Sequence, residues 1–312
     1  MLENIKYKGE LGFLIYKYLF RLKRLVTSEL ISDKKYISKL FLKRQGYLLN
    51  LDNPKSLNEK IQWLKLNNRA DLHTQLADKF AVRQYIKSNF GEEYLIPLLF
   101  ETTDFNQIVS DNLPEAPFII KASHDSGSYV IVKDKSKINW SKLKVDCRWW
   151  LCKNYYWFER EWQYKNIKPR IIVEKLLLTK SGIIPYDYKL NVINGKVEFI
   201  YVAVDRENTN KRNIYSRNWE PLHFTWASKN KKTDELRGPE IPMPSTMKEM
   251  IDIAERVGKI FPYIRVDFYD VDGKVYFGEI TQHHGGGFDQ IKPIEWDYKL
   301  GELLDLKYGI EP

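Results

Sequence analysis

The segment that most constrains the fold runs from residue 263 to residue 288, with the sequence YIRVDFYDVDGKVYFGEITQHHGGGF. Two runs of alternating polar and apolar residues flank residues 270–273 (DVDG), and an Asp-Gly turn between such runs predicts a β-hairpin. Successive side chains of a strand point to opposite faces, so Arg265, Asp267 and Tyr269 share one face of the first strand. The hairpin therefore gathers polar side chains on one side of a sheet.

The returning strand places Glu279 and Thr281 on one face, and pairing across the turn can bring Asp267 close to Glu279. Two converging carboxylates beside Arg265 suit a hard cation, because Mg²⁺ usually takes one or two protein carboxylates together with substrate phosphates. Glycines 285–287 would leave room for a ligand to approach the backbone. A surface hairpin with solvated charges is the competing interpretation of this segment taken alone.

Composition and charge limit the class of protein. The chain has 312 residues, of which 43% are hydrophobic and 14% aromatic, so it can form about two domains with a sizeable core. The net charge of +9 is uneven, because residues 1–75 hold 15 Lys and Arg against 7 Asp and Glu. A basic region of this kind is compatible with nucleic acid, an anionic membrane surface or an anionic substrate.

The sequence also bears on location. The two cysteines, Cys147 and Cys152, lack a second pair for a zinc site, and as buried free thiols they fit a reducing compartment. The first ten residues are too polar for a signal peptide, and no apolar run reaches the roughly 18 residues of a membrane span. We therefore expect a cytoplasmic protein.

Residues 11–26 (LGFLIYKYLFRLKRLV) are predicted to form an aromatic-rich helix with Lys17, Arg21 and Arg24 at helical spacing. Such a helix could lie on an anionic membrane or pack against the body of the protein, and packing is the favoured interpretation. Further along, Ser56 and Glu59 have the spacing of a capping box that begins another helix.

A candidate lid for nucleotide phosphates follows the proline-punctuated linker at residues 111–117. Strand 118–121 ends in Lys121, residues 123–128 form a small-residue loop, and a second strand covers 129–132. Backbone N–H groups of such a loop and a nearby cation can both reach phosphate oxygens. No Gly-Lys-Ser/Thr sequence opens a helix here, so this is no Walker A motif, and a plain hairpin would have the same pattern.

The remaining segments are predicted to form helices, a loop and a buried strand. Residues 71–90 are predicted as one helix, residues 139–164 as tryptophan-rich helices, and residues 208–218 as a loop. The tryptophans favour core packing, with a base-stacking surface as the alternative. Residues 169–178 form a buried strand with one acid, Glu174, and a buried carboxylate needs a partner.

The order of these features resembles the ATP-grasp superfamily, and more specifically the TupA-like ATP-grasp proteins of bacterial surface-polysaccharide and teichuronopeptide gene clusters. The stretches that carry the resemblance are NPKSLNEKIQWLK, LADKFAVRQYI, FIIKASHDSGS, IIVEKLL, DYKLNVINGKV and RVDFYDVDGKVYFGEITQHHGGGF. The resemblance implies an α+β fold in which two α+β subdomains clasp ATP, with a helical N-terminal region. It divides the chain into a basic helical region (1–75), an N-terminal α/β part (76–115), a lid subdomain (116–175) and a C-terminal subdomain with the metal site (176–312).

The resemblance also implies the residues that bind ATP. Glu174 would receive the adenine amino group, Asp187 would hold the ribose hydroxyls, and Lys121 would bind phosphates with Lys79 as a second phosphate lysine. The implied nucleotide-binding residues are Lys79, Lys121, Ser126, Gly127, Ser128, Glu174, Leu176, Leu177 and Asp187.

For the reaction, the resemblance implies a metal group and a cationic group. Mg²⁺ would be held by Asp267, Glu279 and Thr281, where Thr281 replaces the superfamily's usual Asn and is a weaker ligand. The residues that would stabilise the transferring phosphoryl group are Arg265, Arg206 and Lys189. His283 and His284 follow at the expected acceptor pocket, where a structural or substrate-contacting role is favoured over half of a zinc site.

These roles imply an ATP-dependent carboxylate–amine ligase that works through an acyl phosphate. The family's setting suggests a uronic-acid carboxylate on an anionic saccharide, an amino acid or other amine, and contact of the basic N-terminus with the inner membrane surface. No nucleic-acid partner is expected. A glycosyl- or phosphoryl-transferase with the same metal site and a nucleotide-binding module without catalysis stay open as alternatives.

Overall fold

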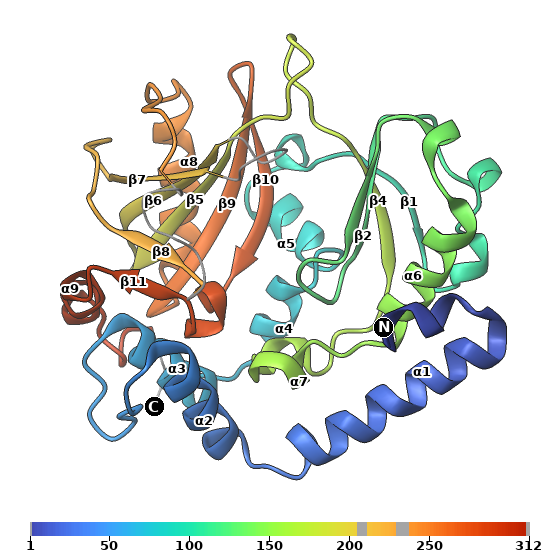
Figure 1. The fold of residues 1–312 in the computed structure, drawn as a ribbon. Helices are drawn as coiled ribbons and strands as arrows, with labels where there is room; N and C mark the ends of the chain where they lie inside the picture. Colours follow the sequence, from blue (N-terminus) through green and yellow to red (C-terminus); the bar gives the residue numbers. More distant parts are fainter. Residues whose placement is uncertain (1, 205–210, 229–236, 310–312) are drawn as a thin grey trace.

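The computed structural model describes residues 2–204, 211–228 and 237–309. Two antiparallel sheets organise these residues into two lobes (Figure 1). The four-stranded sheet has the order β1 (Leu98–Thr102), β4 (Ile171–Lys175), β2 (Phe118–Ala122), β3 (Tyr129–Val132). The five-stranded sheet has the order β10 (Lys274–Thr281), β9 (Tyr263–Val271), β5 (Asp187–Ile193), β6 (Lys196–Val204), β7 (Lys211–Ser216). A small third sheet pairs β8 (Thr225–Ala227) with β11 (Gln290–Lys292).

Helices surround both sheets. The α-helices are α1 (Gly9–Arg24), α2 (Asp33–Gln45), α3 (Leu57–Asn67), α4 (Asp71–Ala77), α5 (Val82–Asn89), α6 (Trp140–Cys152), α7 (Tyr156–Glu159), α8 (Met247–Gly258) and α9 (Glu295–Leu303). Short 3₁₀ segments include Leu2–Tyr7, Glu92–Tyr94, Trp162–Tyr164 and His284–Gly287, and a π-helical turn covers Leu25–Glu29. Within the described ranges, no helix combines the length and apolarity that crossing a bilayer would need.

Strand alternation explains how the five-stranded sheet carries both a core and a site. In β9 the side chains of Ile264 and Val266 are fully buried in the cluster that contains Met250 of α8. Arg265 and Asp267 alternate with them along the strand and point to the other face. The hydrophobic alternation therefore fixes which face of the sheet receives the charged residues.

The four-stranded sheet follows the same rule. Phe118 and Ile120 of β2 are fully buried against α6, where Cys147 is also buried. Ile119 and Lys121 alternate with them and line the space between the two lobes. Lys121 therefore faces the five-stranded lobe rather than the core of its own lobe.

The predicted hairpin is confirmed in its register. Asp267 on β9 lies opposite Glu279 on β10, with a bulge between Phe277 and Glu279. Asp272 and Gly273 at the turn both have positive φ, 54° and 87°, which is the backbone that an Asp-Gly turn supplies. The capping box is also present, because Glu59 N–H donates to Ser56 Oγ and Ser56 N–H to a Glu59 carboxylate oxygen.

Two predicted elements are wrong. The single helix expected at 71–90 is broken, because α4 ends at Ala77 and α5 begins at Val82. Asp78 turns the chain at this break by accepting a hydrogen bond from the N–H of Phe80 at 2.9 Å. The loop expected at 208–218 contains strand β7 over 211–216, which forms the edge of the five-stranded sheet. Polar side chains on an edge strand hid its strand character.

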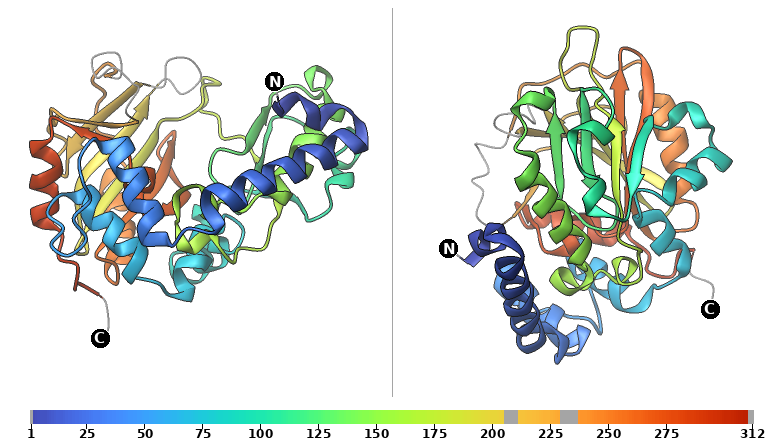
Figure 2. Two further views of the ribbon diagram at one scale, coloured as in Figure 1. Left: turned by 60° about the horizontal axis from the view of Figure 1, so that its bottom comes forward. Right: turned by 90° about the vertical axis from the view of Figure 1, so that its right-hand side faces the viewer.

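The N-terminal region contacts both lobes (Figure 2). Helix α1 packs on the four-stranded lobe through Phe13, whose ring lies 6.5 Å from that of Trp149. Helix α2 packs on the five-stranded lobe, where Phe41 and Phe288 share a buried cluster. The predicted helix at 11–26 is confirmed and packs through one face only. The four-part division of the chain stays a prediction.

Candidate active site

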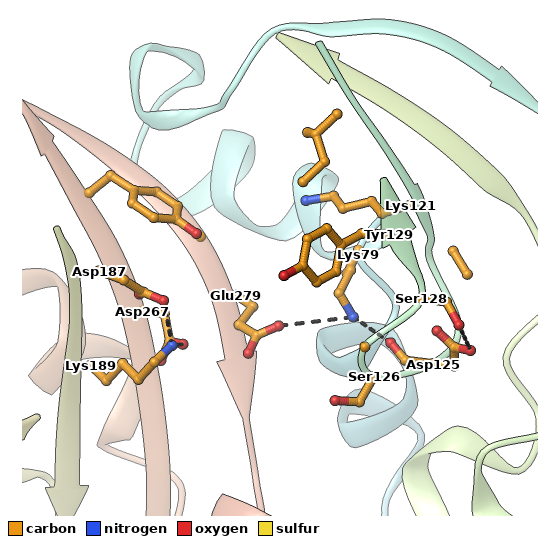
Figure 3. A pocket seen from close by; sticks show the side chains of 15 residues that line it. Lys79, Lys121, Asp125, Ser126, Ser128, Tyr129, Asp187, Lys189, Asp267 and Glu279 are labelled. Atoms are coloured by element: carbon orange, nitrogen blue, oxygen red, sulfur yellow. Dashed lines mark hydrogen bonds and ion pairs between the residues drawn. The ribbon is translucent and has the colours of Figure 1, made fainter. Parts of the chain in front are cut away.

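A cleft lies between the two sheets and receives side chains from both lobes (Figure 3). Its polar part encloses about 230 Å³. Its lining consists of Lys79, Ile119, Lys121, Ala122, Asp125, Ser126, Gly127, Ser128, Tyr129, Asp187, Lys189, Asp267, Tyr269, Gly278 and Glu279. An adjoining hollow of about 330 Å³ shares Ile119, Lys121, Tyr129 and Tyr269 with it. The two spaces therefore form one continuous cleft with a charged end and an apolar end.

Glu174 marks the apolar end. Its carboxylate is 4% exposed and is neutralised by two cations, with Lys121 Nζ at 2.6 Å and Arg83 Nη1 at 3.2 Å. Leu176 and Leu177 line the same hollow just after the strand that carries Glu174. A flat apolar space with one buried carboxylate at its rim can hold an aromatic base that presents an amino group.

The small-residue loop after β2 is held by the buried His124 and is exposed at its tip. The buried ring of His124 bonds through Nε2 to the carbonyl of Trp150 at 2.9 Å, and its Nδ1 accepts from the N–H of Arg170 at 3.3 Å. These contacts need a neutral ring, and burial lowers the pKa of His124 accordingly. Ser126 and Gly127 are exposed at the tip, where their backbone N–H groups can meet a ligand.

Ser128 lines the cleft, and its hydroxyl bonds within the loop. Its side chain is buried and donates to Asp125 Oδ2 at 2.6 Å. Lys153 of the segment after α6 reaches both groups, 2.6 Å from Asp125 Oδ2 and 2.6 Å from Ser128 Oγ. The side chain of Ser128 therefore stiffens the loop, whose residues Ser126, Gly127 and Ser128 all line the cleft.

Lys79 spans the cleft from the break between α4 and α5. Its N–H donates to the carbonyl of Ser123 at 3.1 Å, and its ammonium group donates to the carbonyl of Asp125 at 2.7 Å. The same ammonium group lies 3.9 Å from Glu279 Oε2 on the other lobe. A continuous helix over 71–90 would have aimed this side chain elsewhere, so the break creates the contact.

A dense group of charges forms the polar end. Lys189 of β5 donates to Asp267 and lies 2.7 Å from Asp187 Oδ2. Arg265 holds Asp267 with two bonds, Nε to Oδ1 at 2.6 Å and Nη2 to Oδ2 at 2.8 Å, and its Nη2 also donates to Glu279 Oε1 at 2.9 Å. Two cations therefore fix three carboxylates on the sheet face that looks into the cleft.

Glu279 is held as an anion. Burial acts to raise the pKa of its carboxyl, but the ammonium of Lys79 and the guanidinium of Arg265, helped by Lys189, outweigh burial and lower the pKa to about 2. The side chain keeps 37% of its surface exposed, so it faces the cleft as well as its cationic neighbours. It therefore presents an ionised carboxylate, paired with Arg265 and Lys79, to the cleft.

The oxygen donors here suit magnesium. Asp267 and Glu279 lie on opposed strands and contact the same Arg265 nitrogen, so their carboxylates are adjacent. Thr281 donates its hydroxyl to Glu279 Oε1 at 3.4 Å and stands beside them. In the described part of the chain, no three His, Cys, Asp or Glu side chains are grouped as a ready metal site. Phosphate oxygens would therefore have to complete any coordination sphere.

The two histidines after the hairpin are buried, and His284 contacts the charged group. The His284 ring stacks on Trp226 with centroids 3.8 Å apart, and its Nδ1 faces Arg265 Nη1 at 3.0 Å. Burial keeps the pKa of His284 well below its usual value, so Nδ1 can accept this bond. His283 faces Gln163 Nε2 at 3.1 Å. Both rings are therefore buried supports of the site.

The three glycines do not leave the open backbone that the sequence suggested. The carbonyl of Gly286 accepts from Lys65 Nζ at 2.8 Å and from Gln62 Nε2 at 2.9 Å. Gly286 has φ of 60°, and a Cβ there would lie 2.4 Å from Glu159 Oε2. Glycine is needed because the loop turns tightly against buried side chains.

Sequence reasoning missed the residues that support the loops from a distance. Asp125, Lys153, Arg83, Lys65 and Gln62 all make contacts to parts of the site that are far from them in sequence. No pattern in the sequence pairs these residues with the segments that they contact. Arg206, expected among the catalytic residues, lies outside the described residues.

Comparison with known proteins now identifies the class. The fold and the cleft together define an ATP-grasp protein, as the α+β prediction expected. The chain belongs to the TupA-like ATP-grasp family, whose model matches residues 59–305. No curated protein matches the sequence.

Solved structures with a similar arrangement include three ATP-grasp ligases. The D-alanine–D-alanine ligase of Helicobacter pylori is 15% identical, with a TM-score of 0.41 over 80% of this chain and 69% of that one. The Bacillus anthracis enzyme is 17% identical, with a TM-score of 0.38 over 66% of this chain. N5-carboxyaminoimidazole ribonucleotide synthetase is 12% identical, with a TM-score of 0.38 over 71% of this chain and 50% of that one. The chain spans 56% of the length of the Bacillus anthracis ligase.

Proposed function

We propose that the protein is an ATP-dependent carboxylate–amine ligase. The observation that carries this proposal is the charged cleft, in which Lys79, Lys121 and Lys189 converge from two lobes on the face that presents Asp267 and Glu279. Two ammonium groups opposite two carboxylates, with the ammonium group of Lys189 beside Asp267 on the same sheet, suit a polyphosphate together with a divalent cation. Membership of the ATP-grasp family makes ATP the natural occupant.

The residues divide the work along the cleft. The apolar end with Glu174, Leu176 and Leu177 would take the adenine, and the exposed tip at Ser126 and Gly127 would close over the phosphates. Lys79 and Lys121 would hold the phosphates from the loop side. Asp187 lines the cleft beside Lys189, where it can meet a ribose hydroxyl. Asp267, Glu279 and Thr281 would hold Mg²⁺, which would draw charge from the phosphate oxygens.

The reaction needs positioning and charge stabilisation from this chain. A substrate carboxylate oxygen attacks the γ-phosphorus of ATP, ADP leaves, and an acyl phosphate forms. An amine nitrogen then attacks the acyl carbon, phosphate leaves, and the amine proton passes to solvent. Arg265, Lys189 and Arg206 would stabilise the charge that builds up on the transferring group.

The proposed carboxylate belongs to a uronic acid of an anionic saccharide, and the proposed amine is an amino acid or a related compound. The family's association with bacterial surface polysaccharide supports this choice, and the basic N-terminal region is suited to an acidic polymer or precursor. The proposed setting is the cytoplasm, with biosynthesis of a capsule or a similar polymer as the role.

The test is ADP release from Mg·ATP with pairs of uronic-acid sugars and amino acids, followed by product mass. ADP that forms only when both partners are present, with a product of amide mass, supports the ligase. A product that has gained a sugar or phosphoryl group instead would favour a transferase. ATP binding without ADP from any pair would argue for a nucleotide-binding module.

The site assignment is tested by Glu279→Gln. Loss of this charge should weaken the hold on Mg²⁺ and so lower the rate of ADP release by about a hundredfold or more, which is the scale at which one preorganised group stabilises developing charge. It should also raise the Mg²⁺ concentration needed for half-maximal rate. Glu302→Gln, at an exposed carboxylate outside the cleft, is the matched control. Equal rates for both variants would contradict the assignment.

A further inference from the structure

Helix α1 has two apolar faces, and only one of them is covered. Phe13, Tyr16 and Phe20 lie on the inner face, where Tyr16 and Phe20 place their rings 4.7 and 4.8 Å from Trp149. Figure 1 shows the helix along the outer edge of the molecule, with no element of the fold on its other side. The inner face alone accounts for the packing of α1 on the four-stranded lobe.

The outer face is a continuous apolar stripe. Its exposed members are Leu11, Leu14, Ile15, Tyr18, Leu19, Leu22, Leu25, Val26 and Leu30. Leu11, Val26 and Leu30 keep 71%, 69% and 76% of their surface exposed. The spacing of three and four residues places the members from Leu11 to Leu22 on one side of α1, opposite Phe13 and Phe20. Leu25, Val26 and Leu30 continue the stripe over the π-helical turn and the residue after it. At about 1.5 Å per residue the part of the stripe on α1 is about 17 Å long, and its exposed side chains form a large apolar surface to leave in water.

Cations border the stripe. Lys17, Arg21 and Lys23 are exposed, and no hydrogen bond or ion pair engages their side chains within the described chain. The helix's acids are satisfied elsewhere, because Glu10 pairs with Arg148 at 2.6 Å and Glu29 pairs with Arg24 at 2.5 Å. The stripe therefore has free positive charge beside it and no free negative charge.

We propose that the outer face of α1, residues 11–30, docks flat on an anionic lipid bilayer. An aliphatic stripe can enter the boundary between headgroups and acyl chains while flanking Lys and Arg contact anionic headgroups. The charge pattern selects this occupant, because a second copy of the helix would bring the same three cations together. The site lies away from the cleft, so the proposal does not depend on the reaction assigned to the cleft.

The experiment is co-sedimentation of the full chain with vesicles of phosphatidylcholine alone and of phosphatidylcholine mixed with phosphatidylglycerol. Binding is expected only to the anionic vesicles and should weaken as salt is raised. Lys17→Gln with Arg21→Gln should weaken binding by about fivefold for each cation removed. Leu11→Gln with Leu22→Gln should weaken it by roughly a hundredfold, since each Leu loses its burial in lipid.

Ile183→Gln with Met243→Gln is the control, because both side chains are similarly exposed but lie outside α1. The control should bind like the unmodified chain. Circular dichroism should show that all variants are folded, since only exposed side chains are changed. Absence of binding to anionic vesicles would overturn the proposal, as would equal binding by the α1 variant and the control. Self-association without vesicles that the Leu changes abolish would assign the stripe to a second copy instead.

Discussion

Lys79 is the residue whose removal most directly tests how the two lobes cooperate. Its ammonium group is the bridge from the loop carbonyl of Asp125, at 2.7 Å, to Glu279 of the hairpin, at 3.9 Å. Lys79→Met keeps the length of the side chain and removes the charge. We expect weaker ATP binding, because the cation that faces the phosphates is lost.

The size of the effect follows from the contacts. A hydrogen bond to a charged group contributes about 1.5–3 kcal/mol, which alone would weaken ATP binding by about 10- to 150-fold. Part of this free-energy loss is offset, because in the free protein the same ammonium already bonds to the carbonyl of Asp125. ATP must replace that contact when it binds. A loss of about tenfold is therefore expected.

Calorimetric titration with Mg·ATP gives the affinity, and Lys87→Met is the control. Lys87 is an exposed lysine of α5 that pairs with Glu92 at 2.6 Å. The control should bind ATP like the unmodified protein. An affinity of Lys79→Met within twofold of the control would refute the argument and remove Lys79 from the phosphate site.

Three further predictions concern single groups of the site. Lys121→Met should weaken ATP binding about tenfold in the same titration. Arg83→Met removes the other partner of Glu174, and Arg83 does not line the cleft. This variant should have a lower melting temperature but an unchanged affinity for ATP. The pKa of Glu279 is lowered from 4.5 to about 2, so its stabilising effect is complete above pH 4.5 and is lost as the pH falls through 2. Melting temperatures from pH 6 down to 3 should therefore fall less steeply for Glu279→Gln, and parallel curves would argue against the shift. Placing a side chain on the left-handed backbone of Gly286 costs about 1–2 kcal/mol. Gly286→Ala should reduce the free energy of unfolding by more than that, because the added Cβ would meet Glu159. Gly127→Ala, where φ is 85° and the space is open, should show the backbone cost alone. Equal denaturant midpoints for the two glycine variants would disprove the close contact.

Local patterns in the sequence were sufficient to predict the hairpin and the charged residues that share its face. Alternation alone put Arg265 and Asp267 on one face, and the Asp-Gly turn set the register that brings Glu279 opposite Asp267. Both inferences hold because strand period and turn geometry are properties of a few adjacent residues. The capping box at Ser56 was predictable for the same reason.

Contacts between distant segments were beyond such reasoning. The position of Lys79 depends on a helix break that Asp78 causes, and hydrophobic periodicity runs through the break without interruption. The contacts of Lys153 with the loop at 123–128 join residues 25 or more apart, and no local pattern pairs them. Ser128 was predicted as part of the small-residue loop, but only the folded loop shows that its hydroxyl bonds to Asp125.

The N-terminal region acts as a brace between the lobes, with α1 fixed to one and α2 to the other. The chain between them turns at Leu25–Glu29, where the buried guanidinium of Arg160 holds the carbonyls of Ser28 and Ile31. With α1 resting on a bilayer, the four-stranded lobe would be stationary relative to the membrane. The five-stranded lobe, with its carboxylates, would then be the part that swings toward and away from a substrate presented at the lipid surface.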